Sequence, residues 1–181
     1  MGERPALDSL GPPFWNPASA AHWKLPDSDA RSISLEQHRG KPMIVIFYLG
    51  YGCVHCNQQL QSFAKKTKDF ADAGISLLAI STDSGADLKQ AHAKSKDGRF
   101  PFPLLSDVKH DVFRAYRAFD DFENKPLHAT FLIDAAGLIR WQDISFDPFQ
   151  DADFLLKEAR RLLQFPASKV ASRRDPASAA K

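Results

Sequence analysis

The stretch Met43-Ile-Val-Ile-Phe-Tyr48 decides the fold class of this chain. It is a short apolar run of β-branched and aromatic residues, which is typical of a buried strand. From about Val54 the apolar residues recur with the period of a helix, and one face collects Leu60, Phe63, Ala64, Thr67, Phe70 and Ala71. Gly74 ends this helix, and residues 75–80 form the next apolar run. Strand, helix and strand in this order predict a parallel pair joined by a right-handed crossover.

The remainder of the chain continues the alternation of strands and helices. A pair of strands at 130–133 and 138–141 flanks the turn sequence Asp134-Ala-Ala-Gly137, which indicates a hairpin. Further helices are expected at about 84–95, at 106–119 and at 151–164, the first of them capped by Asp83 or Ser84. The pattern predicts an α/β fold with one mixed central sheet that is flanked by helices on both faces.

Length and composition exclude several classes of protein. The chain has 181 residues, which suits one domain, and its 44% hydrophobic content is enough to form a core. With 24 basic and 22 acidic residues the net charge is +2, and no block of like charge predicts a nucleic-acid partner. The longest apolar run, residues 43–49, is far shorter than the ~18 residues of a membrane span, so none is expected.

The two ends of the chain differ in composition from its middle. Six of the 12 prolines lie in residues 1–42, and we interpret residues 1–22 as an extended N-terminal arm that Trp15, Trp23 and Leu25 would pin to the body. Residues 23–165 form the predicted domain, and residues 166–181 are expected to be a disordered tail rich in Pro, Ala and Ser. No secretory signal is recognisable, so a cytoplasmic location is expected.

Cys53 and Cys56 are the two cysteines of the chain, and they fall where the first strand turns into the first helix. A helix N-terminus offers free N–H groups and the positive end of the helix dipole, both of which favour a thiolate. Gly50 and Gly52 give the turn the freedom to expose the sulfurs. The pair therefore predicts dithiol–disulfide chemistry, with two buried core cysteines as the structural alternative. A metal site would have Cys53, His55 and Cys56 as partial ligands, but a closed zinc site needs four, so no metal is expected.

Four stretches, spread over about residues 23–165, resemble the peroxiredoxin-like AhpC/TSA (redoxin) branch of the thioredoxin superfamily. They are Leu25-Pro-Asp27 with Gly40-Lys-Pro42, Val45-Ile-Phe-Tyr48 before the cysteines, Phe102-Pro-Leu-Leu-Ser-Asp107, and Ala129-Thr-Phe-Leu-Ile-Asp134 with Gly137-Leu-Ile-Arg140. The resemblance implies a thioredoxin-like fold and a thiol oxidoreductase without a cofactor. Its implied partners are a thioredoxin-type or small-thiol electron donor and a hydroperoxide or disulfide substrate.

The chain departs from the family pattern at the site itself. Aligned with peroxiredoxins, Cys56 takes the place of the peroxidatic cysteine, Cys53 that of a threonine, and His128 that of an arginine. Thioredoxin-type reductases place a cis-proline at position 128 and use the first cysteine as nucleophile. The motif Tyr-x-Gly-x-x-Cys-x-x-Cys, seen in a third group of peroxiredoxin-like proteins, fits Tyr48 to Cys56 best. Disulfide oxidases resemble this chain in carrying a histidine at the place of His55.

The leading hypothesis is a peroxiredoxin-like thiol oxidoreductase that cycles Cys53 and Cys56 between dithiol and disulfide, with His55 and His128 as assisting residues. Tyr51 and Trp141 are candidates for the walls of a substrate groove. A dedicated disulfide reductase or oxidase is the first alternative, and a redoxin-fold copper or metal chaperone that uses both sulfurs and His128 is the second. We expect the attacking sulfur to depend on the substrate, with Cys53 attacking disulfides and Cys56 attacking peroxides.

Overall fold

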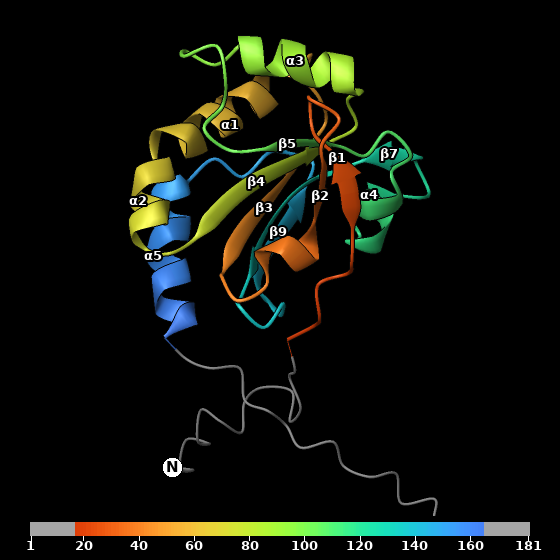
Figure 1. The fold of residues 1–181 in the computed structure, drawn as a ribbon. Helices are drawn as coiled ribbons and strands as arrows, with labels where there is room; N and C mark the ends of the chain where they lie inside the picture. Colours follow the sequence, from red (N-terminus) through yellow and green to blue (C-terminus); the bar gives the residue numbers. More distant parts are fainter. Residues whose placement is uncertain (1–16, 165–181) are drawn as a thin grey trace, which may run out of the picture.

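The computed structural model describes residues 17–164, which fold around a five-stranded sheet in the order β5-β4-β3-β8-β9 (Figure 1). The central strand is β3 (Met43–Tyr48), and β4 (Ser76–Ser81) and β5 (Leu104–Ser106) run parallel to it. On its other side β8 (His128–Ile133) and β9 (Ile139–Ser145) form the antiparallel hairpin. The predicted mixed sheet, its parallel start and its closing hairpin are confirmed.

The side chains of β3 point alternately to the two faces of the sheet, and each face carries its own hydrophobic core. Ile44, Ile46 and Tyr48 pack under α1 (Val54–Lys65), α2 (Thr67–Asp72), α3 (Gly85–Ala93) and α5 (Ala152–Leu163). Val45 and Phe47 face the other core, which is covered by β1 (Lys24–Pro26), β2 (Ser32–Ser34), the 3₁₀ helix η2 (Leu35–His38) and α4 (Asp111–Ala115). The sheet is therefore covered on both faces, which explains why every side chain of β3 is buried.

The described part of the N-terminal segment lies along the second core. Trp23 and Leu25 are buried there, and the Ala20 N–H donates to the carbonyl of Gly137 in the β8–β9 turn at 2.8 Å. Trp15 and the predicted tail 166–181 lie outside the described residues. The arm is therefore attached by main-chain bonds as well as by its aromatic side chain.

The sequence prediction of a helix at 106–119 was wrong in extent. Ser106 ends β5, α4 covers only Asp111–Ala115, and residues 119–120 pair with 125–126 as the small β6–β7 hairpin (Phe119–Asp120 and Lys125–Pro126). His110 and Arg117 both have positive φ, at 60° and 58°, and such backbone cannot continue a right-handed helix on either side. Asp107 lies before α4 and caps it from outside, because its carboxylate accepts the N–H groups of Val112 and Phe113.

Two finer details of the helices also emerge. The helix predicted after the cysteines is interrupted at Lys66, which separates α1 from α2. Of the two cap candidates for α3, Ser84 is confirmed, because its hydroxyl accepts the Asp87 N–H.

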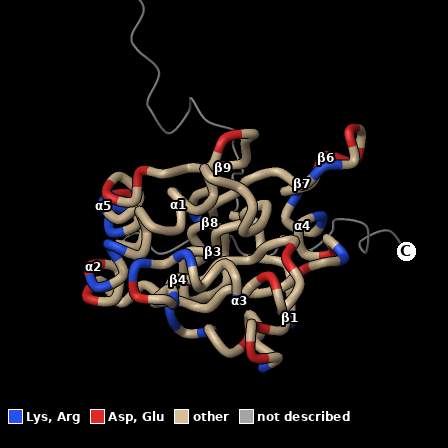
Figure 2. The backbone as a smooth tube through the Cα atoms, turned by 90° about the horizontal axis from the view of Figure 1, so that it is seen from above, with Lys and Arg blue, Asp and Glu red and all other residues tan. Residues whose placement is uncertain are grey.

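Along the described backbone, basic and acidic residues alternate around α2 and α5 (Figure 2). Among the described residues, none of the helices combines the length and the apolar character needed to cross a membrane.

Candidate active site

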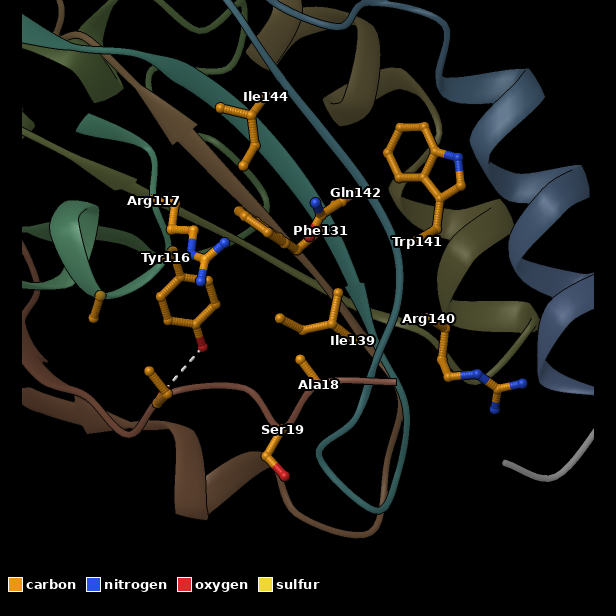
Figure 3. Close-up of a pocket in the computed structure, with 12 residues that line it drawn as sticks. Ala18, Ser19, Tyr116, Arg117, Phe131, Ile139, Arg140, Trp141, Gln142 and Ile144 are labelled. Atoms are coloured by element: carbon orange, nitrogen blue, oxygen red, sulfur yellow. Dashed lines mark hydrogen bonds between the residues drawn. The ribbon is translucent and has the colours of Figure 1, made fainter. Parts of the chain in front are cut away.

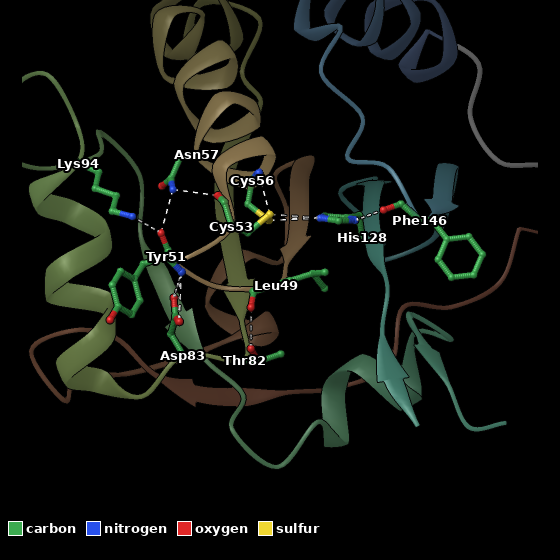
Figure 4. The surroundings of a disulfide bond; sticks show 10 residues. All are labelled: Leu49, Tyr51, Cys53, Cys56, Asn57, Thr82, Asp83, Lys94, His128 and Phe146. Carbon is green, nitrogen blue, oxygen red and sulfur yellow. Dashed lines mark hydrogen bonds between the residues drawn. A yellow bond between two sulfur atoms is a disulfide. The ribbon is translucent and has the colours of Figure 1, made fainter. Parts of the chain in front are cut away.

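Cys53 and Cys56 lie at the start of α1 and form a disulfide bond (Figure 4). Cys53 is the N-cap residue, and its Sγ accepts the Cys56 N–H at 3.2 Å. Cys56 sits inside the first turn and is fully buried, whereas Cys53 is half-buried. The two sulfurs therefore have different surroundings: the first is reachable and capped by a helix N–H, and the second is enclosed.

His128, the first residue of β8, faces both sulfurs. Its Nε2 lies 3.2 Å from Cys56 Sγ and 3.9 Å from Cys53 Sγ. Its Nδ1 lies 2.7 Å from the carbonyl oxygen of Phe146. A carbonyl only accepts, so Nδ1 carries the proton, and in the neutral ring Nε2 presents its lone pair to the sulfurs.

Burial lowers the pKa of His128, and the charge of His55 adds to this effect, while the Phe146 carbonyl and Asp147 oppose it. The ring is therefore neutral at pH 7, and Nε2 is available to accept a proton. Both sulfurs lie within hydrogen-bond reach of this nitrogen, and Cys56 Sγ is the nearer, at 3.2 Å against 3.9 Å for Cys53 Sγ.

The main chain of Tyr51, two residues before Cys53, is held at both ends. Its N–H donates to the carboxylate of Asp83, at 3.0 and 3.2 Å, and its carbonyl accepts from Asn57 Nδ2, at 2.9 Å, and from Lys94 Nζ. Burial raises the pKa of Asp83, and its bond to the Tyr51 N–H partly offsets that rise. Figure 4 shows these contacts as one network around the loop that leads into the cysteines.

The two glycines of this loop have different roles, although the sequence suggested one role for both. Gly50 has φ +121°, and a Cβ built on it would lie 2.6 Å from Asp83 Oδ1. Gly52 has no positive φ, and a Cβ there would meet nothing within 4 Å. Gly50 is therefore required for the approach of the Asp83 carboxylate, and Gly52 is not.

The structure brings Cys53, Cys56 and His128 together, with their donor atoms within 4.8 Å of one another. His55 is exposed on the first turn of α1 and acts on His128 through charge. Tyr51 lies in the adjoining loop, with its ring directed away from the sulfurs and under the ammonium group of Lys94 (Figure 4).

Trp141 is not brought to the cysteine pair. It is opposite Leu132 on the β8–β9 ladder, four residues along β8 from His128, or about 13 Å at the usual rise of a strand. Its ring packs against Phe149 and Phe154.

A pocket of about 560 Å³ lies on the other face of the β8–β9 hairpin, where Tyr116, Phe131 and Ile144 line it (Figure 3). Tyr116 and Phe131 belong to the second core, and the cysteines pack on the first. This pocket is therefore separated from the sulfurs by the sheet.

Sequence reasoning missed the residues that support the site: Asn57, Asp83, Lys94 and the carbonyl of Phe146. Asp83 carried a signal, since a polar residue that follows a buried strand lies at the sheet edge where the cysteine loop also begins. The contact with the Phe146 carbonyl has no sequence signal, because every residue has a main-chain carbonyl and the side chain of Phe146 takes no part in the bond.

Comparisons with known proteins agree with this geometry. The model of the AhpC/TSA family matches residues 18–142. A putative peroxiredoxin of Mycobacterium tuberculosis is 32% identical over 126 residues, which are 66% of this chain and 78% of that protein. The chloroplastic peroxiredoxin Q of Oryza sativa subsp. japonica is 30% identical over 125 residues, 68% of this chain and 56% of the relative.

Among solved structures, the peroxidoxin BcpB of Mycobacterium tuberculosis has a TM-score of 0.69 at 24% identity, and the match covers 82% of this chain and 96% of that one. This likeness supports the thioredoxin-type fold.

The chain belongs to the AhpC/TSA family, since the family model covers more than half of it. It spans a little over half the length of the plant peroxiredoxin Q proteins that it matches.

Proposed function

We propose that this protein is a thiol-dependent oxidoreductase that reduces hydroperoxides by cycling Cys53 and Cys56 between dithiol and disulfide. The observation that carries the proposal is the arrangement of a half-buried N-cap sulfur, a buried second sulfur and a neutral imidazole 3.2 Å from the latter. Relatives named as peroxiredoxins and as a thioredoxin-dependent peroxide reductase support the substrate class and a thioredoxin-type donor.

Cys53 is the attacking sulfur in this proposal. Its thiolate would accept the Cys56 N–H at the positive end of α1, which stabilises the charged form. It displaces ROH from a hydroperoxide, with one proton taken up by the leaving oxygen, and becomes a sulfenic acid. This assignment replaces the expectation from the sequence and the family alignment that Cys56 attacks peroxides, because Cys56 is fully buried.

Cys56 then resolves the sulfenic acid. His128 Nε2 takes the proton of the Cys56 thiol, the new thiolate attacks the Cys53 sulfur, and the proton leaves with the hydroxyl group as water. A donor dithiol regenerates the pair in two steps: one donor thiolate attacks Cys53, and the departing Cys56 thiolate takes up a proton that a donor thiol supplies through His128 Nε2. The second donor thiolate then attacks the mixed disulfide, releases Cys53, which takes up the second donor proton, and leaves as the donor disulfide. The Phe146 carbonyl keeps Nδ1 protonated throughout, so Nε2 is always the exchanging nitrogen.

A disulfide reductase is the second candidate, favoured by the partial exposure of Cys53, which a protein disulfide would need. Tyr51 remains the candidate for a groove wall beside Cys53. The cytoplasmic location and the small-thiol donor stay predictions from the sequence.

The test compares hydrogen peroxide as substrate, with thioredoxin, its reductase and NADPH as the donor system, with the insulin disulfide as substrate. Because thioredoxin reduces insulin directly, the insulin assay uses dithiothreitol as the donor, and the rate without the protein is subtracted. We expect peroxide-dependent NADPH oxidation by the wild type and its loss in Cys53→Ser. His22→Ala, a substitution on the surface away from the site, is the matched control. Reduction of insulin without consumption of peroxide would replace the proposed activity with the second candidate.

A further inference from the structure

We infer that the reduced site binds one soft d10 cation, with Zn²⁺ as its probe, through Cys53 Sγ, Cys56 Sγ and His128 Nε2. The inference rests on the proposed dithiol form, because a disulfide offers no thiolates. It replaces the expectation of no metal and keeps the donor set of the metal-chaperone alternative, because His128 Nε2 lies 3.2 and 3.9 Å from the two sulfurs.

Donor spacing is the first observation. In a tetrahedral zinc site with Zn–S of about 2.3 Å and Zn–N of about 2.0 Å, a sulfur and a nitrogen lie about 3.5 Å apart. The two separations from His128 Nε2 to the sulfurs, 3.2 and 3.9 Å, fall on either side of that value. Reduction lets the sulfurs move apart, and the residues that bear them are adjacent on one helical turn, so no strand or helix has to shift.

Orientation of the imidazole is a second and independent observation. Histidines that bind metals usually donate their other ring N–H to a carbonyl or carboxylate, which fixes the tautomer. His128 does so through Nδ1, at 2.7 Å from the Phe146 carbonyl oxygen. Nε2 is thereby presented as a lone-pair donor to the same point that both sulfurs face (Figure 4).

The donor set selects the class of metal. Two thiolates and an imidazole suit Zn²⁺ or Cu⁺, whereas Mg²⁺ and Ca²⁺ prefer oxygen ligands. Cys53 is half-buried and gives access from solvent, and with three protein ligands the fourth position is open. Zn²⁺ binds both sulfurs as thiolates, so each thiol that is still protonated releases its proton when the ion binds.

In the metal complex both sulfurs are bound to the ion, so neither can attack a substrate and the disulfide cannot form until the ion leaves. The cation would act as a reversible block on the attacking and resolving sulfurs together.

The experiment titrates Zn²⁺ into the protein in the presence of a chromophoric chelator. We expect one ion per reduced wild-type chain, at least tenfold weaker binding in His128→Ala, and unchanged affinity in His22→Ala, which removes a surface imidazole away from the donor set. The oxidised wild type should bind no Zn²⁺, and this control does not depend on a substitution that could disturb the fold. Mg²⁺ should not compete with Zn²⁺ for the site.

Protection of the thiols gives a second readout. Zn²⁺ should slow alkylation of both cysteines by iodoacetamide, and a chelator should restore the rate. Equal zinc affinity in the reduced and oxidised wild type, or in His128→Ala and the wild type, would overturn the inference. Since peroxide turnover is measured separately in metal-free buffer, failure of zinc binding leaves the proposed function standing.

Discussion

Replacing Gly50 by alanine tests how the cysteine loop is built. An alanine Cβ at this position would lie 2.6 Å from Asp83 Oδ1, and the backbone φ of +121° disfavours any side chain. The Asp83 carboxylate would have to withdraw and release the Tyr51 N–H. Backbone strain of ~1–3 kcal/mol and a lost bond to a charged acceptor, ~1.5–3 kcal/mol, together predict a loss of about 2.5–6 kcal/mol in the free energy of unfolding.

Urea unfolding of the oxidised proteins, followed by tryptophan fluorescence, measures this loss. Gly52→Ala is the matched control, two residues away in the same loop, with open space for a Cβ and no positive φ. It should leave stability unchanged or raise it by ~0.4–1 kcal/mol. Because Asp83→Ala removes the clashing oxygen, the double variant with Gly50→Ala should lose less than the sum of the two single variants. Equal effects of Gly50→Ala and Gly52→Ala would refute the reasoning.

Four further outcomes are expected. Loss of the proton acceptor in His128→Ala should slow formation of the disulfide after peroxide treatment by ~10²–10⁴-fold. Since burial lowers the pKa of His128, the wild-type rate should hold as pH falls to the ordinary histidine value of about 6.5 and decline only below it; a decline that begins near pH 7.5 would contradict the assignment. Asp107→Ala leaves the buried N–H groups of Val112 and Phe113 without their acceptor, and urea unfolding should show a loss of ~2–4 kcal/mol. Deletion of residues 166–181 should change stability by less than ~0.5 kcal/mol, and a large fall in melting temperature would show that this segment packs on the domain.

The fold was predictable wherever hydrophobic period and turn chemistry agree. Met43–Tyr48 is apolar at every position because both faces of the central strand are buried. Such a run indicates a buried strand without any knowledge of the elements that pack on it. The helix predicted at 106–119 was too long because the hydrophobic pattern does not show where the backbone leaves the helical conformation. Its apolar residues do reach the core, but the positive φ values of His110 and Arg117 leave no mark in a hydrophobic pattern.

The reactive side chains of the site were predictable from the sequence, and the contacts that position them were not. Cys53 and Cys56 are visible as a motif, and His128 follows from the family alignment. The tautomer of His128 depends on the Phe146 carbonyl, and the position of the loop depends on Asp83. Both are long-range contacts that the spacing of residues along the chain does not encode.

The central claim, that Cys53 attacks and Cys56 resolves, is tested most directly by trapping the sulfenic acid. Reduced Cys56→Ser and Cys53→Ser are each treated with hydrogen peroxide in the presence of dimedone and analysed by intact-mass and peptide mass spectrometry. If Cys53 attacks, a dimedone adduct forms on Cys53 in Cys56→Ser and none forms in Cys53→Ser. An adduct on Cys56 in Cys53→Ser, with none on Cys53 in the other variant, would contradict it and return the attacking role to the position that the family alignment assigns.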